Sequence, residues 1–202
     1  AQPPPHSSSA APGSAPPPAE PDPKVAARAH FEKGLELARE KATAAALAEF
    51  LTSRKLFPTK SATTNAALCL RQLHRYDEAL VMVEALLREF KLTPDEKAEA
   101  QRLAVELGAL VGTLAIQGAE PGAAVVVDGQ RHGEFPLVDP LRVAAGTHIV
   151  RVYKEGYLPF QAKVDVAGGQ TARIQAHLAL LGLRGRLEVL EVGGRHLDIV
   201  VD

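Results

Sequence analysis

The sequence predicts a two-part chain: an N-terminal array of about five antiparallel α-helices, followed by a small all-β antiparallel sandwich. Residues 24–107 hold a single glycine, Gly34, and are rich in Ala, Leu and Glu, whereas fourteen of the sixteen glycines fall from Gly108 onward. Good helix formers without glycine favour helices, and valine-rich sequence with frequent glycine favours strands and turns. The boundary is therefore expected within residues 108–112, between a helical domain (24–110) and a β domain (112–179).

Composition limits the classes of partner and site. The 202 residues carry a formal net charge of -1, which disfavours nucleic acid or an anionic membrane as an electrostatic partner. No apolar run approaches the roughly 18 residues that a transmembrane helix needs. Cys69 is the one cysteine, which excludes an intramolecular disulfide and every multi-cysteine metal site.

Residues 1–23 hold nine of the fifteen prolines and no large apolar residue. Such a segment cannot offset its ordering entropy by burying surface, so we expect a disordered tether; a PxxP-type ligand is the less favoured alternative. The Ala-Gln start is typical of a chain left after signal-peptide cleavage, which predicts export. The alternative is an artificial truncation.

The helices are expected from their caps and apolar spacing. Asp22-Pro23 offers an N-cap followed by proline at the first helical position, and apolar or small residues then recur at helical spacing. A second helix stops at Phe57-Pro58. Further helices are expected over 63–73 and 76–90, and the capping box Thr93-Pro-Asp-Glu96 opens a fifth helix that ends near Leu107.

A repeat with a period of about 33 residues runs through these helices. Gly34, Ala46, Phe50 and Pro58 recur as Ala67, Ala79, Val83 and Lys91. With the RYDEAL run at 75–80, this pattern resembles tetratricopeptide repeats over roughly residues 27–93. The resemblance implies a surface that binds a protein or peptide, with four polar candidates on the first helices of the repeats: Arg28, Lys33, Asn65 and Arg71. The alternative is that these are ordinary solvated positions on a helical spacer.

Strict alternation predicts the strands of the second half. His148, Val150 and Val152 share one face, with Ile149, Arg151 and Tyr153 on the other; residues 160–166 and 171–178 alternate in the same way. Period two with one apolar face is typical of antiparallel sheets packed as a sandwich. Tyr153, on the polar face, is a further candidate for contact with a partner.

The order of motifs in residues 112–179 resembles the PEGA domain. An EPGA turn (120–123) follows the first strand, then Asp128-Gly129, and then a G-x-H-x-V-x-V run from Gly146 that leads to Gly156-Tyr157. Residues 180–202 repeat the opening of this pattern, with Gly185 in the place of Gly112, so we expect a second, truncated PEGA-like copy. The resemblance implies a cell-envelope module and names no reactive group.

No constellation of chemical groups predicts catalysis. The seven histidines lack metal-ligand spacing, and Cys69 lies among apolar helical residues, which favours a buried, inert thiol. We therefore expect no enzyme activity, no cofactor and no metal. His148 falls in the apolar register of its strand, which favours a hydrogen-bonded core or rim histidine over a ligand.

The function expected from these patterns is a non-catalytic scaffold of the bacterial cell envelope, exported to the periplasm or wall. The helices would hold a protein or peptide, and the β domain would contact an envelope polymer or protein. The alternative is the ectodomain of a sensory membrane protein whose transmembrane or effector part lies beyond residue 202. Nucleic acid is not expected as a partner, and a membrane only through a segment outside this sequence.

Overall fold

A computed structural model describes residues 22–182. It has two compact units, and the division falls between Gly108 and Ala109. Five helices are followed by seven strands in two sheets, which confirms the predicted fold class. The predicted tether, apart from its last two residues, and nearly all of the predicted second PEGA-like copy lie outside the described residues.

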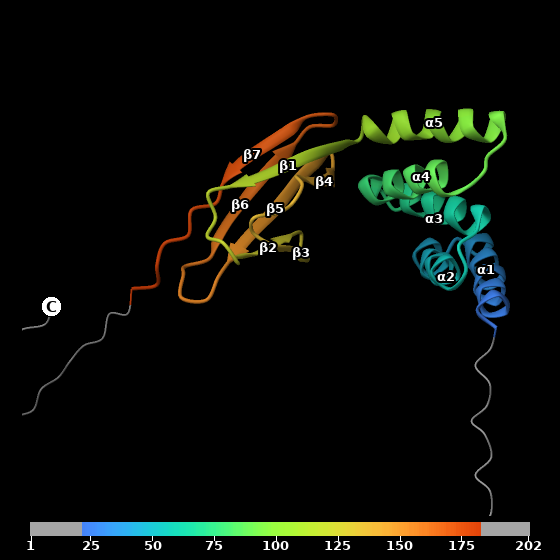
Figure 1. Ribbon diagram of the computed structural model, residues 1–202, viewed down its shortest axis with the longest axis horizontal. Coiled ribbons are helices and arrows are strands. Elements are labelled where there is room, and N and C mark those ends of the chain that lie inside the picture. Colours follow the sequence, from blue (N-terminus) through green and yellow to red (C-terminus); the bar gives the residue numbers. More distant parts are fainter. Residues whose placement is uncertain (1–21, 183–202) are drawn as a thin grey trace, which may run out of the picture. The chain divides into compact units, whose positions relative to one another are not determined.

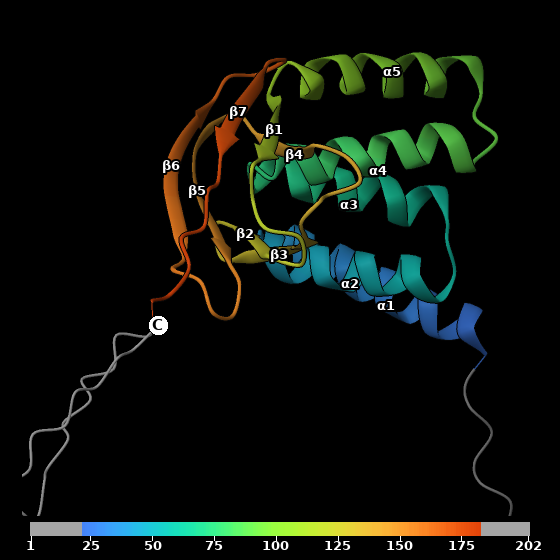
Figure 2. The same ribbon diagram turned by 60° about the vertical axis from the view of Figure 1, so that its left-hand side comes forward.

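The helical unit consists of helices that pack in chain order, each against the next (Figures 1 and 2). Their bounds are α1 (Pro23–Arg39), α2 (Thr43–Leu56), α3 (Lys60–Gln72), α4 (Tyr76–Glu89) and α5 (Pro94–Gly108). The third helix begins ahead of the predicted start at Thr63 because Thr59 caps it: the Thr59 hydroxyl accepts the Ala62 N–H at 3.2 Å.

The other helix caps follow the sequence signals. The Asp22 carboxylate accepts the Lys24 N–H at 2.8 Å ahead of Pro23. At the start of α5, the Glu96 N–H donates to the Thr93 hydroxyl at 3.3 Å, and the Thr93 N–H donates to Glu96 Oε2 at 2.8 Å. This reciprocal pair is the predicted capping box.

The turns of the two helix pairs have the same backbone geometry. Lys41 and His74, which stand one repeat period apart, have φ of 61° and 59°, which non-glycine residues seldom adopt. The Ala42 N–H donates to the Leu37 carbonyl at 2.9 Å, and the Arg75 N–H donates to the Leu70 carbonyl at 3.0 Å. Because the starts and the ends of α2 and α4 are separated by the same period, the helical unit is a structural repeat as well as a sequence repeat.

Small residues let the two helices of each pair approach closely. A Cβ added to Gly34 would lie 2.6 Å from Phe50 Cε1, so any larger residue would force the ring or the helix to shift. Phe50 is fully buried and its ring lies 5.6 Å from that of Phe31. The second pair carries Ala67 and Val83 at the corresponding positions, and both are buried.

The β unit holds two sheets around one core (Figure 1). The strand orders are β4-β1-β7 and β3-β2-β5-β6. Their bounds are β1 (Val111–Gln117), β2 (Ala124–Val127), β3 (Gln130–Glu134), β4 (Leu141–Ala144), β5 (Gly146–Tyr153), β6 (Phe160–Val166) and β7 (Thr171–Gln175).

Strand faces agree with the predicted alternation. Val150 and Val152 of β5 are fully buried, while Ile149 and Tyr153 on its other face are 49% and 45% exposed. The strand pairings are antiparallel except that of β1 with β7, which run parallel with Leu114 opposite Ala172. The sandwich is therefore rich in antiparallel pairs without being wholly antiparallel, because the chain crosses between the sheets before β7.

Within residues 22–182, none of the helices combines the length and the apolar character that crossing a bilayer requires.

Candidate functional site

Each repeat of the helical unit has a cavity between its helices. The first has a volume of about 250 Å³ and is formed by α1, α2 and the start of α3. The second has a volume of about 240 Å³ and is formed by α3, α4 and α5. Several lining positions of the first cavity recur one repeat period later in the second: Ala27 and Lys60, Phe31 and Thr64, Ser53 and Leu86, Thr59 and Leu92.

The two linings differ in chemistry. The first cavity combines two cations and two aromatic rings with hydroxyl groups: Lys24, Arg28, Phe31, Phe57, Ser53, Thr59 and Ser61, beside Ala27. The second is mainly aliphatic, with carboxylates at its rim: Leu68, Leu86, Leu92, Leu103, Val83, Ala67 and Ala100, beside Lys60, Thr64, Glu96 and Glu99. Equivalent positions of the two repeats therefore carry side chains of different chemistry.

Of the predicted binding residues, Arg28 lies in the lining of the first cavity. Its guanidinium is exposed and donates to Glu32 at 2.8 Å, one turn along α1. Lys33 lines neither cavity: its ammonium lies 2.9 Å from Glu49 Oε1 on α2. Hydrogen bonds from His30 and then Lys33 lower the pKa of Glu49, so Lys33 belongs to a contact that ties α1 to α2.

Asn65 and Arg71 of α3 also lie outside both cavities. The Asn65 amide donates back to the Ser61 carbonyl at 2.9 Å, one turn earlier in its own helix. Arg71 is exposed near the C-terminus of α3, where a cation interacts favourably with the helix dipole. Of the four predicted helical residues, Arg28 alone lies in the lining of either cavity.

Sequence reasoning did not single out the aliphatic residues of the second cavity. Leu68 is 42% exposed although it is a leucine in the middle of a helix, and Leu86 and Leu103 face the same cavity. The repeat period offered a signal, because Leu68 stands where the first repeat has Leu35 and Leu103 where α3 has Leu70. The period alone does not show which of these leucines remain exposed, because that depends on how the helices pack.

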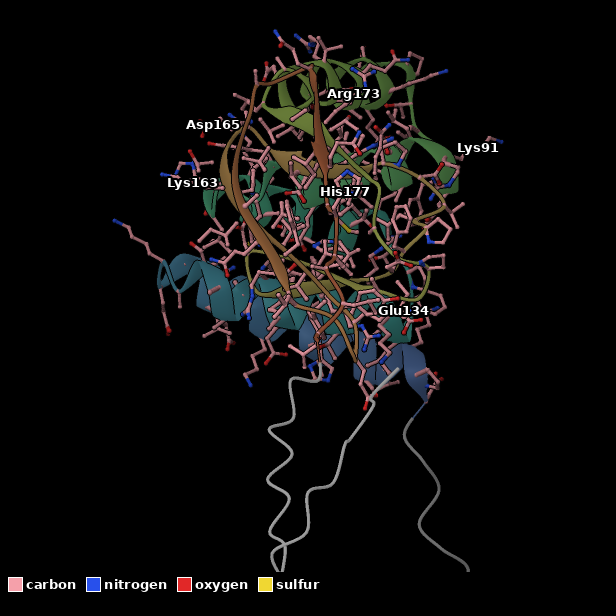
Figure 3. The ribbon with its side chains drawn as sticks, turned by 90° about the vertical axis from the view of Figure 1, so that its left-hand side faces the viewer. Lys91, Glu134, Lys163, Asp165, Arg173 and His177 are labelled. Atoms are coloured by element: carbon pink, nitrogen blue, oxygen red, sulfur yellow. The ribbon has the colours of Figure 1, made fainter. Side chains whose placement is uncertain are left out.

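In the β unit, Tyr153 lies on the outer face of β5 and is half exposed. This face continues onto β6, where Lys163 and Asp165 point outward, and the Thr147 hydroxyl donates to the Asp165 carboxylate (Figure 3). On the other sheet, Arg173 and His177 are exposed along β7 and beyond it (Figure 3). Both outer faces are therefore mainly polar.

The side chains of Asp128 and His148 are hydrogen-bonded at one end of the β2–β5 strand pair. His148 Nδ1 lies 2.6 Å from Asp128 Oδ2, and its Nε2 lies 2.6 Å from the Ala144 carbonyl oxygen. Asp128 Oδ1 accepts the Ile149 N–H at 2.8 Å. His148 is 9% exposed with both ring nitrogens facing acceptors, so it is the hydrogen-bonded rim histidine that its register predicts.

The surroundings of Asp128 favour its ionised form. Partial burial opposes ionisation, but hydrogen bonds from the Ile149 N–H and from His148, with the charges of His148 and His132, outweigh that effect and lower the pKa of Asp128. Asp128 has φ of 49° and precedes Gly129 at 84°, as a tight hairpin turn requires. The Asp-Gly turn thus clamps the start of β5.

A second contact closes the other end of the same strand pair. The Lys154 ammonium donates to the Pro121 carbonyl at 2.9 Å and lies 5.4 Å from the centre of the Tyr157 ring. The Pro121-Gly122 turn is therefore tied to the Gly156-Tyr157 turn. The Asp-Gly turn and the Pro-Gly turn, which stand out in the sequence, therefore each have a structural role at one end of the β2–β5 pair.

Cys69 is buried in α3, and burial raises the pKa of its thiol. A thiol is a weak nucleophile in its protonated form, so this environment does not activate it. Among the described residues, no group of three or more His, Cys, Asp or Glu side chains is placed to hold a metal ion.

The β unit matches a known protein family. Residues 111–180 match the family model of the PEGA domain, which begins with β1 and extends past the end of β7. No curated protein and no solved structure matches the chain.

Proposed function

We propose that this chain is a non-catalytic interaction protein of the bacterial cell envelope. The observation that carries the proposal is the PEGA match over residues 111–180, preceded by a helical repeat with exposed cavities. A PEGA match suggests a binding or scaffold role outside the cytoplasm. In this proposal the β unit contacts an envelope polymer or protein, and the helical unit binds a protein or peptide.

We infer further that the helical unit is a short tetratricopeptide-like array. The inference is supported by the common period of α2 and α4 and by the matching turns at Lys41 and His74. Buried small residues recur at the same period, as Gly34, Ala67 and Ala100. Repeats of this kind bury their apolar faces on their neighbours and leave an extended surface for a ligand.

Residues 180–202 are proposed to open a second PEGA-like copy. The proposal is supported by the sequence alone: Gly185 takes the place of Gly112, and the run Ile199-Val-Val-Asp202 that of Val125-Val-Val-Asp128. These residues, apart from 180–182, lie outside the described part of the chain.

The proposed envelope contact is tested by co-sedimentation with isolated cell-wall sacculi. The full chain is expected to pellet, whereas a chain that ends at Gly108 and retains its helical circular dichroism spectrum is expected to stay in the supernatant. Pelleting of both chains would move the contact to the helical unit. If neither chain pellets, the wall is excluded as the ligand and the proposal is restricted to envelope proteins.

The role of the helical unit is tested with the same two chains. Proteins captured by the full chain from an envelope extract are expected to be captured also by the chain that ends at Gly108. Substitution of Arg28 and Arg71 by glutamate is the matched perturbation, because both are exposed and neither is buried in the core. If the full chain captures proteins and the chain that ends at Gly108 captures none, the helices are not the partner-binding unit.

A further inference from the structure

The second cavity of the helical unit is aliphatic inside and acidic at its rim. Its volume of about 240 Å³ exceeds the roughly 150 Å³ in which an apolar protein cavity binds a benzene molecule. It is large enough for one leucine or phenylalanine side chain. Leu68, at 42% exposure, leaves apolar surface accessible to such a side chain.

The two carboxylates at the rim are in different states of pairing. Glu96 Oε1 lies 2.8 Å from the Lys60 ammonium, and Glu96 Oε2 accepts the Thr93 N–H. Glu99 is exposed, and no residue within 22–182 forms an ion pair or a side-chain hydrogen bond with it. A cation carried by a ligand would therefore meet Glu99 without displacing an existing contact.

The charged residues in the lining of the first cavity are cations, not carboxylates. Lys24 and Arg28 contribute to its lining, no carboxylate does, and hydroxyl groups replace the leucines. An apolar side chain next to a cation is therefore favoured in the second cavity and disfavoured in the first. The two repeats differ in specificity although they share a backbone.

We propose that the α3–α4–α5 cavity binds a segment of a partner protein that presents a leucine or phenylalanine followed at once by an arginine or lysine. The apolar side chain enters among Leu68, Leu86 and Leu103, and the cation lies against Glu99. This inference rests on the proposed role of the helical unit in binding partners and specifies the ligand for one of its cavities.

The test uses acetylated dipeptide amides as probes and the full chain with labelled Leu and Val methyl groups. Acetyl-Leu-Arg-amide at millimolar concentration is expected to shift the methyl resonances of Leu68, Leu86 and Leu103. Acetyl-Leu-Glu-amide should bind more weakly by roughly two- to five-fold, the range of an exposed ion pair. Acetyl-Ala-Arg-amide, without the apolar anchor, should leave these resonances unchanged.

Matched variants on α3 separate the two cavities. Thr64→Phe introduces the residue that the first repeat carries at the equivalent Phe31, and its ring is expected to obstruct the second cavity and weaken binding at least about ten-fold. Ser61→Phe places the same ring at the first cavity and should leave binding unchanged. Leu68→Ser removes exposed apolar surface without filling the cavity and should also weaken binding.

Glu99→Gln is expected to abolish the preference for the arginine probe over the glutamate probe. Absence of methyl shifts, shifts centred on the first cavity, or equal binding by Thr64→Phe and the wild type would each overturn the proposal. If the probes fail while Arg28→Glu and Arg71→Glu still prevent partner capture, the binding role of the helices stands and only the assigned ligand falls. If the probes do not bind and the Arg28→Glu and Arg71→Glu variants still capture partners, both the assigned ligand and the binding role of the helices are excluded.

Discussion

At the scale of single residues, the contact between Asp128 and His148 explains why two separate sequence motifs belong together. The residues are far apart in the sequence, yet the antiparallel pairing of β2 with β5 brings the Asp-Gly turn to the first residues of β5. The carboxylate satisfies both a backbone N–H and an imidazole nitrogen. Its role is therefore to fix the turn to the neighbouring strand.

Removing this carboxylate is expected to destabilise the β unit. Asp128→Ala leaves the Ile149 N–H and His148 without their acceptor and should lower the free energy of unfolding by about 1–2 kcal/mol, a moderate figure because Asp128 is half exposed. Asp128→Asn tolerates the same positive φ and can still accept the Ile149 N–H, so its loss should be smaller. Urea unfolding measures the stability of both variants. Equal losses in Asp128→Ala and Asp128→Asn would show that the hydrogen bond from the Ile149 N–H does not contribute.

The same residue predicts a pH dependence with a defined sign. The folded state lowers the pKa of Asp128 below the value of about 3.9 for an unperturbed aspartate. Its contribution to stability is therefore fully present above that unfolded value and is lost as the pH falls through the folded pKa. The difference in unfolding free energy between wild type and Asp128→Asn should shrink as the pH is lowered from neutral through that range. A constant difference would show that the charge of Asp128 is not involved.

Sequence patterns could predict the environment of His148 but not its partners. Alternation along β5 places His148 on the same face as Val150 and Val152, and that face is buried. The identity of the acceptors depends on which strand lies beside β5 and in which register, and alternation carries no information on either. For the same reason Leu141–Ala144, a strand too short to show a clear alternation, was not distinguished in the sequence.

At the scale of elements, the two helix crossings are alternative solutions to one packing problem. The first repeat combines glycine with phenylalanine, as Gly34 and Phe50, and the second combines alanine with valine, as Ala67 and Val83. The larger residue of one helix is matched by the smaller residue of the other. The two repeats therefore agree more closely in the summed volume at the crossing than in the residue at either position.

Gly34→Ala is expected to destabilise the helical unit by about 1–3 kcal/mol, because its Cβ would lie 2.6 Å from a carbon of the Phe50 ring. Alanine is the better helix former, but the overpacking outweighs the helix propensity. The double variant Gly34→Ala/Phe50→Val, which copies the second repeat, should lose less than the sum of its two single changes. Thermal unfolding of all three variants checks this coupling, and additive losses would refute it.

Helix α5, the last helix of the unit, carries exposed charged residues where the corresponding residues of α3 are buried. In α3, Ala62, Ala66 and Cys69 are buried. The residues one repeat period later in α5 are Asp95, Glu99 and Arg102, and all three are exposed. A terminal helix of a repeat array requires a polar outer face, because no further repeat covers it. The polar outer face of α5 supports the proposal that this helix caps the array.

The capping box that Thr93 and Glu96 form at the start of α5 gives a separate prediction. Thr93→Ala removes the hydroxyl that accepts the Glu96 N–H and is expected to cost about 1 kcal/mol of stability. Thr93→Ser keeps the acceptor and should be close to wild type. Hydrogen exchange of the first turn of α5 locates the effect: faster exchange there in the alanine variant alone is expected. Equal exchange in all three proteins would exclude a capping role for Thr93.

The strand order is the part of the fold that local patterns could not predict. Each strand's buried face follows from its alternation, and the hairpin turns connect neighbours in sequence. The parallel pairing of β1 with β7 joins the first and last strands of the unit, with Thr113 opposite Thr171, and is set by closure of the sandwich as a whole. The helix order needed no such information, because each helix packs mainly against the next in the chain.

At the scale of the whole molecule, each of the two units has its own core within residues 22–182. The helical core is built around Phe50, Leu70 and Val83, and the β core around Leu114, Val125 and Val150. Glycine content changes at the same point as the architecture, which is why the division near Gly108 could be expected from composition. In the proposed function, the helical unit and the PEGA-matching unit would bind different ligands.

Because each unit has its own core, a destabilising substitution in one is expected to leave the stability of the other unchanged. Gly34→Ala should lower the unfolding temperature of the helical unit, and Asp128→Ala that of the β unit, each without moving the other transition. Calorimetry of the full chain should then resolve two transitions, and hydrogen exchange should assign them to residues 22–108 and 109–182. A single transition that both variants shift equally would show instead that the units unfold as one cooperative body, and binding at one could then change the stability of the other.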